Sequence, residues 1–458
     1  MKERILKPKI LFFLIVLFGI TTFYQAQSRD VKKLNEGWQF TLAKEELDFI
    51  NLTDTSWKSI TIPHTWNNKD IQTARRVHYG TGWYKRELAV SDEDTDKQHF
   101  LKFEGVGQYA EVYINNRYVG EHLGSYSAFV FNITDFLKQD EPNTLLVKVN
   151  NELTESYPKD NFLFGIYGGI YRDVSIITTN DLHIALTDFA SSGVYVHQEK
   201  VSSTNALLKI ENLLKNESSE IKQISVRNKL VSENSKVVAE NLIDTLLYPG
   251  GAVPIVSYLN VDNPRLWNAK KDPYLYQLKT EVLYDGEVYD EIDQTIGLRY
   301  FSIDHEKGFI LNGEPYRLYG VCRHQEWEDM GNALLPKHHK KDMELINEVG
   351  ATSIRLAHYQ QAEYMYALAD SIGFLIWAEI PFVNGYKLGA DNNAKQQLTE
   401  LIKQNFNHPS IFVWGMHNEV IKGRTVQRPV NLTKELHSLA KTLDPQRYTV
   451  AVSNIWWV

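Results

Sequence analysis

A carboxylate that follows an apolar run is the first feature of the sequence that could do chemistry. Residues 411–414 are β-branched and aromatic, and His417, Asn418 and Glu419 come soon after them. Such a run predicts a short buried strand. A charge beside an apolar core is costly, and these surroundings can raise the pKa of a carboxyl group until it donates protons near neutral pH. Taken alone, the pattern fits a proton donor and a solvent-facing strand-end glutamate equally well.

Polar side chains also gather at the carboxyl ends of three other predicted strands in the same part of the chain. In chain order they are Cys322, Arg323, His324, Glu326 and Asp329, then Arg355, His358 and Tyr359, then Glu379. Because the carboxyl ends of parallel strands meet at one rim, these groups are expected to converge with Glu419. For a single residue such as His324, a hydrogen-bonded structural histidine is an equally good interpretation. The whole set favours an active site.

The elements that would position these residues alternate between strands and helices from about residue 309. Strands are predicted at 317–321, 352–356, 374–380, 411–414 and 448–452, and helices at 337–349, 363–372, 392–406 and 432–443. Gly350 and Gly373 supply helix stop signals. This alternation predicts a parallel sheet. A complete (β/α)₈ barrel needs about 250 residues, so the sequence predicts either a small open sheet or a TIM barrel that the chain contains in part, with about five of its eight strands.

The preceding part of the chain is predicted to be all β. Residues 29–180 contain short runs such as 61–66, and a hairpin signal in which Asn115 and Asn116 join two strands. The long irregular connections favour a jelly-roll sandwich. Residues 181–303 contain a second hairpin signal and have the size of an immunoglobulin-like sandwich, without the cysteine pair of antibody domains.

Composition excludes some classes of partner. The 458-residue chain has a formal net charge of −8 and a pI near 6.0, which argues against nucleic acid and against a cationic membrane-surface protein. Aromatic residues make up 12% of the chain. They could stack on sugar rings, although aromatic β-sandwich cores give the same count. Cys322 is the single cysteine, so no intrachain disulfide can form.

The N-terminus predicts export. Four basic residues (Lys2, Arg4, Lys7 and Lys9) precede the apolar residues 10–20, and Ala26 stands where a signal peptidase would cut. This is the pattern of a secretory signal peptide, residues 1–26. The apolar run is short for a membrane span of about 20 residues. The expected location is the periplasm or the exterior, with no membrane attachment of the mature protein.

Several ordered segments resemble glycoside hydrolase family 2. They are Gly320-Val321-Cys322-Arg323-His324, residues 354–359 and 408–419, and upstream residues 169–174, 296–299 and 308–320. The resemblance covers the whole mature chain. It implies a sugar-binding jelly roll at 29–180, an immunoglobulin-like sandwich at 181–303 and a partial TIM-barrel catalytic domain at 304–458.

The resemblance also implies roles for individual residues. Glu419 would be the general acid/base of a retaining β-glycosidase. Asn418 would bind the sugar 2-hydroxyl, and Arg355 would be the cation that keeps the nucleophile ionised. The remaining substrate-binding candidates are His324, His358 and, reaching in from the jelly roll, Asn161.

Two departures from the family pattern stand out. Cys322 occupies a position where the family usually has Asn, which we interpret as a tolerated small strand residue. The nucleophilic glutamate of the family lies on strand seven, which would fall beyond Val458. A retaining mechanism needs two carboxyl groups about 5–5.5 Å apart, and Glu379 on the third strand is a poor substitute. We therefore expect a C-terminally truncated chain that is inactive alone.

The function expected from the resemblance is hydrolysis of terminal non-reducing β-D-galactosides by the full-length protein. A β-glucuronidase or β-mannosidase of the same family is the alternative. A catalytically dead carbohydrate-binding protein is the alternative from another class. No cofactor is expected, because the residues after Glu379 do not reproduce the Mg²⁺ ligand pattern of some relatives, although metal dependence stays open. The expected partner is a carbohydrate substrate, and homo-oligomerisation also stays open.

Overall fold

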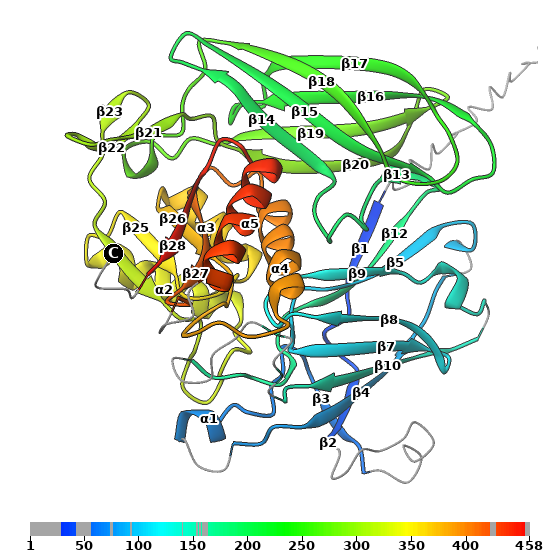
Figure 1. Ribbon diagram of the computed structural model, residues 1–458. Coiled ribbons are helices and arrows are strands. Elements are labelled where there is room, and N and C mark those ends of the chain that lie inside the picture. The colour runs from blue at the N-terminus through cyan, green and yellow to red at the C-terminus, as the bar shows by residue number, and fades with distance from the viewer. Residues whose placement is uncertain are drawn as a thin grey trace, which may run out of the picture.

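Two β-sandwiches flank a sheet of parallel strands covered by helices (Figure 1). The computed structural model describes residues 29–42, 56–73, 77–91, 94–139, 141–152, 154, 157, 164–421 and 427–453. The predicted signal peptide (1–26) and Asn161 lie outside these described residues. No helix in the described part of the chain is long and apolar enough to cross a membrane.

The first sandwich packs a four-stranded sheet, in the order β1-β12-β5-β9, on a six-stranded sheet, in the order β3-β2-β4-β10-β7-β8. Its strands are β1 (Arg29–Lys33), β2 (Trp38–Leu42), β3 (Lys58–Ile60), β4 (Thr81–Leu88), β5 (Gln98–Phe103), β7 (Tyr109–Ile114), β8 (Arg117–Leu123), β9 (Phe129–Asn132), β10 (Asn143–Asn150) and β12 (Val174–Thr179). A short pair, β6 (Val106–Gly107) and β11 (Gly169–Ile170), and the one-turn helix α1 (Asp70–Thr73) complete it. Residues such as Leu101, Val112 and Val147 are fully buried between the sheets.

The second sandwich has two antiparallel sheets with its own apolar core. Strand β15 (Asn205–Asn216) pairs with β13 (Leu182–Ile184), β14 (Val194–Val201) and β18 (Val253–Asp262), and the other sheet has the order β17-β16-β19-β20. The strands of that sheet are β16 (Lys222–Val231), β17 (Val237–Leu247), β19 (Tyr276–Tyr284) and β20 (Glu287–Ile296). Strand β15 alternates between half-buried and buried residues along its whole length, as expected for a sheet with one face in the core.

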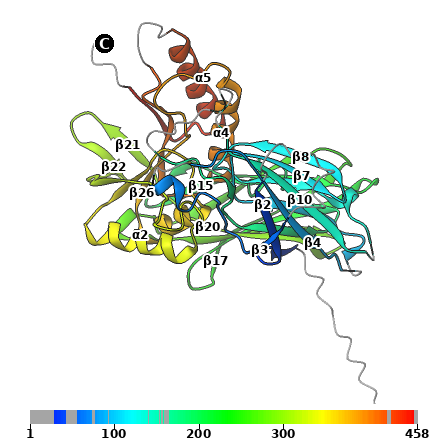
Figure 2. The same ribbon diagram turned by 90° about the horizontal axis from the view of Figure 1, so that it is seen from below.

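The parallel sheet has the order β24-β25-β26-β27-β28. A small antiparallel sheet, β21 (Phe301–Asp304), β22 (Gly308–Leu311) and β23 (Glu314–Pro315), leads into it. Its strands are β24 (Gly320–Arg323), β25 (Ser353–Leu356), β26 (Leu375–Glu379), β27 (Ile411–Asn418) and β28 (Tyr448–Val452), and its helices are α2 (Pro336–Glu348), α3 (Glu363–Ile372), α4 (Asp391–Gln404) and α5 (Gln427–Leu443). Seen from below, α2 lies at one end of this part, and α4 and α5 lie at the other (Figure 2). Each predicted βα unit is present, so the prediction of a partial barrel is confirmed.

Some predicted elements differ from the structure. Residues 61–66, predicted as a strand, form turns after β3, where the backbone of Trp66 bonds to Gly168 instead of a strand neighbour. The first barrel strand begins at Gly320 rather than 317, and α5 begins at Gln427 rather than 432. Element ends are set by tertiary contacts that a local pattern does not contain.

Buried polar contacts fix the sandwiches against the barrel. The Arg172 guanidinium, from the first sandwich, donates through Nη2 to Gln325 Oε1 (3.1 Å) and to the Gln360 carbonyl (3.0 Å). From the second sandwich, Arg299 donates to the carbonyls of Pro409 and Ile411, both at 2.7 Å. Each of these hydrogen bonds from a charged guanidinium contributes about 1.5–3 kcal/mol to the docking of a sandwich on the barrel. The barrel is therefore held at a fixed orientation.

Candidate active site at the carboxyl end of the parallel sheet

Strand β27 carries the predicted proton donor to the rim of the sheet. The predicted strand of residues 411–414 is too short, because parallel pairing with β28 continues to Asn418 after a register shift between Gly415 and His417. Glu419 follows in the left-handed region (φ +56°), and its N–H donates to the Val452 carbonyl at 2.8 Å. The Glu419 side chain is half-buried and has no hydrogen-bond or ion-pair partner among the described residues. Its carboxylate is thus available to a ligand.

Two predicted site residues, Arg355 and His358, contact the buried carboxylate of Glu379 at the end of β26, and a third, Asn418, joins them through Arg355. Arg355, at the end of β25, donates to Glu379 Oε2 from Nε (3.1 Å) and Nη2 (3.0 Å). The same Nη2 is 2.9 Å from Asn418 Oδ1. The other oxygen, Glu379 Oε1, is 2.6 Å from His358 Nδ1. Because the carboxylate accepts only, the proton of this short contact is on the imidazole. One network therefore orients Arg355, His358 and Asn418.

Glu379 is a positioning residue in this geometry. Both of its oxygens are occupied by protein donors, and 1% of its side chain is exposed. A nucleophile needs an oxygen that can reach the anomeric carbon. The arrangement therefore argues against Glu379 as the nucleophile, which agrees with the expectation from the sequence that Glu379 is a poor substitute.

His324 lies beside this network without joining it. Its ring centroid is 5.6 Å from that of His358, and its Nδ1 is 3.5 Å from the Tyr359 hydroxyl. Burial lowers the pKa of His324, and the neighbouring His358 lowers it further. The imidazole is accordingly neutral near pH 7, and a neutral ring has one donor and one acceptor nitrogen for sugar hydroxyls.

The first sandwich supplies an aromatic wall that sequence reasoning did not find. Tyr126 stacks on Tyr359, with centroids 4.2 Å apart and an interplanar angle of 9°. The ring centroid of Phe164 lies 5.0 Å from that of Tyr359, 5.8 Å from that of His324 and 6.2 Å from that of His358. Nothing in the local sequence around Tyr126 or Phe164 indicates these contacts, because their partners lie about 200 residues away. Asn161, the predicted contact from this sandwich, is outside the described residues.

The other polar residues near β24 serve packing. Arg323 is buried and pairs with Asp342 at 2.6 Å. Burial raises the pKa of Glu326, which accepts from the Gly165 N–H at 3.3 Å and so faces the first sandwich. Cys322 is exposed on the strand, as expected for a tolerated small residue. Of the set at this strand, only His324 lies with the rim network.

Gly415 leaves the space that the network occupies. A Cβ at this position would lie 2.4 Å from Glu379 Cβ and 2.6 Å from Trp377 Nε1. Gly415→Ala is expected to destabilise the barrel by about 1–3 kcal/mol, the usual cost of overpacking, in a thermal or denaturant unfolding measurement. Gly251→Ala is the matched control, because nothing lies within 4 Å of its added Cβ. An equal, small effect of both substitutions would contradict the close packing.

His417 is expected to make the stability of the protein depend on pH. Burial lowers the pKa of His417 to about 4, and its Nε2 lies 2.8 Å from Thr433 Oγ1. The folded-state pKa is below the unfolded value near 6.5, so the stabilisation is complete above about pH 6.5 and is lost as the pH falls toward 4, by up to about 1.4 kcal/mol per pH unit. His417→Gln is expected to flatten the plot of unfolding free energy against pH in this window. His305→Gln is the control and should leave the slope unchanged, because 88% of the His305 side chain is exposed. An unchanged slope for His417→Gln as well would contradict the burial of the His417 imidazole.

No group of three or more His, Cys, Asp or Glu side chains suited to a metal ion occurs among the residues that the structure describes. Asn418 and Glu419 contribute one amide and one carboxylate to the rim, which is not by itself a metal-ligand set.

Comparisons with known proteins identify three consecutive matches. Residues 31–180 match the sugar-binding domain of glycosyl hydrolases family 2, residues 189–299 match a further domain of that family, and residues 302–456 match its TIM-barrel domain. A β-glucuronidase of Bacteroides fragilis is 40% identical over 456 residues, covering 97% of this chain and 63% of that protein.

Two solved structures show the same arrangement. A putative β-galactosidase from Bacteroides fragilis has a TM-score of 0.89 and 41% identity, covering 93% of this chain and 64% of that one. A β-glucuronidase from Bacteroides uniformis has a TM-score of 0.87 and 33% identity, covering 93% and 52%. The chain thus spans between about half and just under two thirds of the length of these three relatives.

Proposed function

This chain belongs to glycoside hydrolase family 2, and from this premise we propose that the full-length protein is a retaining β-glycosidase that removes terminal sugars from non-reducing ends. The observation that carries the proposal is the rim of the parallel sheet. There the Arg355–Glu379–His358 network holds Asn418 immediately before Glu419, whose carboxylate has no partner among the residues that the structure describes.

Glu419 is assigned as the general acid/base. Its proton would pass to the glycosidic oxygen as the bond to the anomeric carbon breaks, and the resulting carboxylate would then take a proton from the water that releases the sugar. The half-buried position and the lack of a protein partner in the described part of the chain leave its oxygens free for both steps.

Asn418 and His358 are assigned to the sugar hydroxyls. Since Asn418 Oδ1 accepts from Arg355, its Nδ2 remains as a donor for the 2-hydroxyl, a contact that strengthens in the oxocarbenium-like transition state. Since His358 Nδ1 donates to Glu379, its Nε2 remains as the acceptor of a hydroxyl proton. Arg355 is assigned, from the family resemblance, as the cation that favours an ionised nucleophile. We expect that nucleophile from a carboxylate on a seventh barrel strand, which the described residues do not include.

The sugar we propose is a β-D-glucuronide, in place of the β-D-galactoside expected from the sequence. The support comes from relatives named β-glucuronidase at 40% and 33% identity. The β-galactoside stays as the second candidate, because a structure at 41% identity is described as a putative β-galactosidase.

A panel of p-nitrophenyl β-D-glucuronide, galactoside and mannoside tests the choice on the full-length protein. We expect kcat/KM for the glucuronide to exceed the others by at least about tenfold, equivalent to about 1.4 kcal/mol of transition-state binding. A reversed order would establish the galactoside or mannoside instead. Binding of all three without hydrolysis would support the carbohydrate-binding alternative.

We further propose that the protein is exported, as the sequence of its first 26 residues predicts. Mass spectrometry of the protein from its native host should find an N-terminus close to residue 27. An intact Met1 on the mature protein would contradict export by this route.

A further inference from the structure

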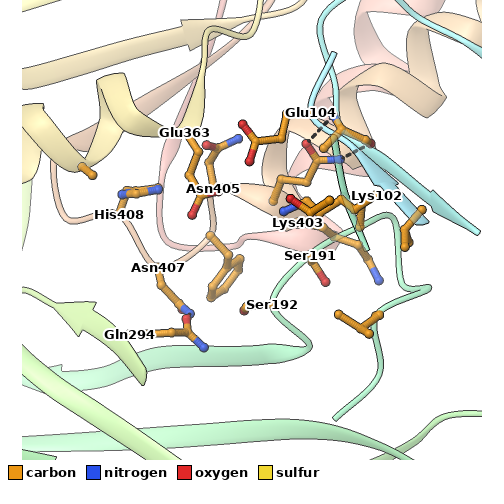
Figure 3. A pocket seen from close by; sticks show the side chains of 18 of the residues that line it. Lys102, Glu104, Ser191, Ser192, Gln294, Glu363, Lys403, Asn405, Asn407 and His408 are labelled. Carbon is orange, nitrogen blue, oxygen red and sulfur yellow. Dashed lines mark hydrogen bonds between the residues drawn. The ribbon is translucent and has the colours of Figure 1, made fainter. Parts of the chain in front are cut away.

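A cavity of about 450 Å³ lies where the two sandwiches and the barrel meet (Figure 3). Its walls come from β5 and β12, from the segment before β14, from β20, and from the ends of α3 and α4. None of Arg355, His358, Glu379 or Glu419 lines it, so it is separate from the rim. Small-molecule sites of about 300–1,000 Å³ are common at domain interfaces.

Three carboxylates line the cavity, those of Glu104, Asp293 and Glu363, and the first and last of them are close enough to interact. Glu104 comes from the first sandwich and Glu363 from the first turn of α3, and Figure 3 shows them on the same side of the cavity. Neither has a hydrogen-bond or ion-pair partner among the described residues. Burial raises the pKa of Glu104, and the charge of Glu363 raises it further while Lys102 lowers it. Glu104 is half-buried and Glu363 is exposed, so the cost of an unpaired carboxylate falls mainly on Glu104, and a ligand that donates a hydrogen bond to it would be stabilised.

Hydrogen-bond donors also line the cavity. Lys102 faces the cavity without a side-chain partner in the described part of the chain. Gln294 Nε2 is a buried amide donor that lacks an acceptor, while its Oε1 accepts from Asn407 at 2.5 Å. Leu186 and Phe406 add apolar surface. The lining therefore offers paired acceptors, separate donors and an apolar patch.

We propose that this junction cavity is a second ligand site that binds a mono- or disaccharide. Vicinal hydroxyls of a sugar donate in pairs to carboxylates and also accept from an ammonium or an amide, and the C–H faces of the ring pack on apolar side chains. A purely anionic ligand would meet Glu104 and Glu363, and an apolar ligand would leave the polar groups unpaired. A hydroxylated ligand satisfies both walls.

The test is calorimetric titration of the Glu419→Gln protein, which cannot consume its ligand efficiently, with methyl β-D-glucoside, methyl β-D-galactoside and cellobiose. At least one of these should bind, and Glu104→Gln combined with Glu363→Gln should weaken that binding by at least about tenfold, or 1.4 kcal/mol. Glu306→Gln is the matched control, because 77% of its side chain is exposed and it lies outside the cavity.

Hydrogen–deuterium exchange locates the bound sugar independently of the variants. Residues 186–192 and 403–408, which line the cavity, should gain protection when the sugar is bound. The proposal is overturned if none of the three sugars binds, if the paired substitutions leave the affinity unchanged, or if protection appears only at the rim. Spermidine binding in place of the sugars would also overturn it, since two carboxylates could instead select an amine.

Discussion

Glu419→Gln is expected to lower kcat/KM of the full-length protein by about 10²–10⁴-fold on glycosides with poor leaving groups, the usual contribution of general acid–base catalysis. The alkyl group of an alkyl glycoside leaves as an alkoxide unless its oxygen is protonated, so cleavage depends on the acid. Dinitrophenolate is a stable anion that leaves without protonation, so the rate of bond breaking in a dinitrophenyl glycoside should fall much less. The half-buried carboxylate of Glu419, without a protein partner among the described residues, is what makes this residue the choice.

The measurement is kcat/KM for one alkyl and one dinitrophenyl glycoside of the same sugar, in wild type and variant. Glu328→Gln is a matched control, because Glu328 is exposed on the loop after β24 and carries the same change of charge. Equal losses on the two leaving groups would count against the acid/base role. Azide or formate, which replace a missing base in the second step, should restore turnover of the activated substrate only.

Glu379→Ala is expected to destabilise the barrel by about 3–5 kcal/mol, the cost of leaving a buried charge without its partner. Arg355, with 19% of its side chain exposed, would lose its only carboxylate in the described structure. His358 would lose its 2.6 Å contact at the same time. Since Arg355 also holds Asn418, the rim should lose its order and activity should fall with stability.

Denaturant unfolding followed by tryptophan fluorescence measures this effect, with Glu291→Ala as control. Glu291 also pairs with a cation, Lys279 at 2.9 Å, but 38% of its side chain is exposed. Exposed pairs contribute about 0–1 kcal/mol. If the two substitutions cost the same, the buried network does not hold the rim. Glu379→Gln separates packing from charge, because it keeps the volume and still leaves Arg355 without a countercharge.

Local patterns predicted the barrel units because each one carries its own signals. The helical periodicity of α3 and the stop signal at Gly373 (φ +87°) both lie within about a dozen consecutive residues, so a local pattern contains them. The β27 end was missed for the opposite reason. Gly415, Met416 and His417 have weak strand preference alone, and their extended backbone is held by β28, a strand more than 30 residues later.

The candidate site divides in the same way. Arg355, His358, Asn418 and Glu419 follow predicted strands, so the geometry of a parallel sheet brings them together. The role of Glu379 as the common acceptor of Arg355 and His358 depends on side-chain directions, which the sequence does not specify. Phe164 and Tyr126 come from another part of the fold, and their contacts with the rim follow from how the first sandwich docks.

The aromatic wall has a consequence for the order in which the protein is made. Tyr126 leaves the ribosome before Tyr359, by roughly 10–50 s at about 5–20 residues per second. The first sandwich has its own core, so we expect it to fold before the barrel as the chain emerges, whether from the ribosome or from the export channel. The loop after β25 therefore emerges next to a finished surface, and Tyr359 docks on a template instead of searching for a partner. A slow-folding variant of the first sandwich would thus impair the barrel during synthesis, even where the mature enzyme tolerates the substitution.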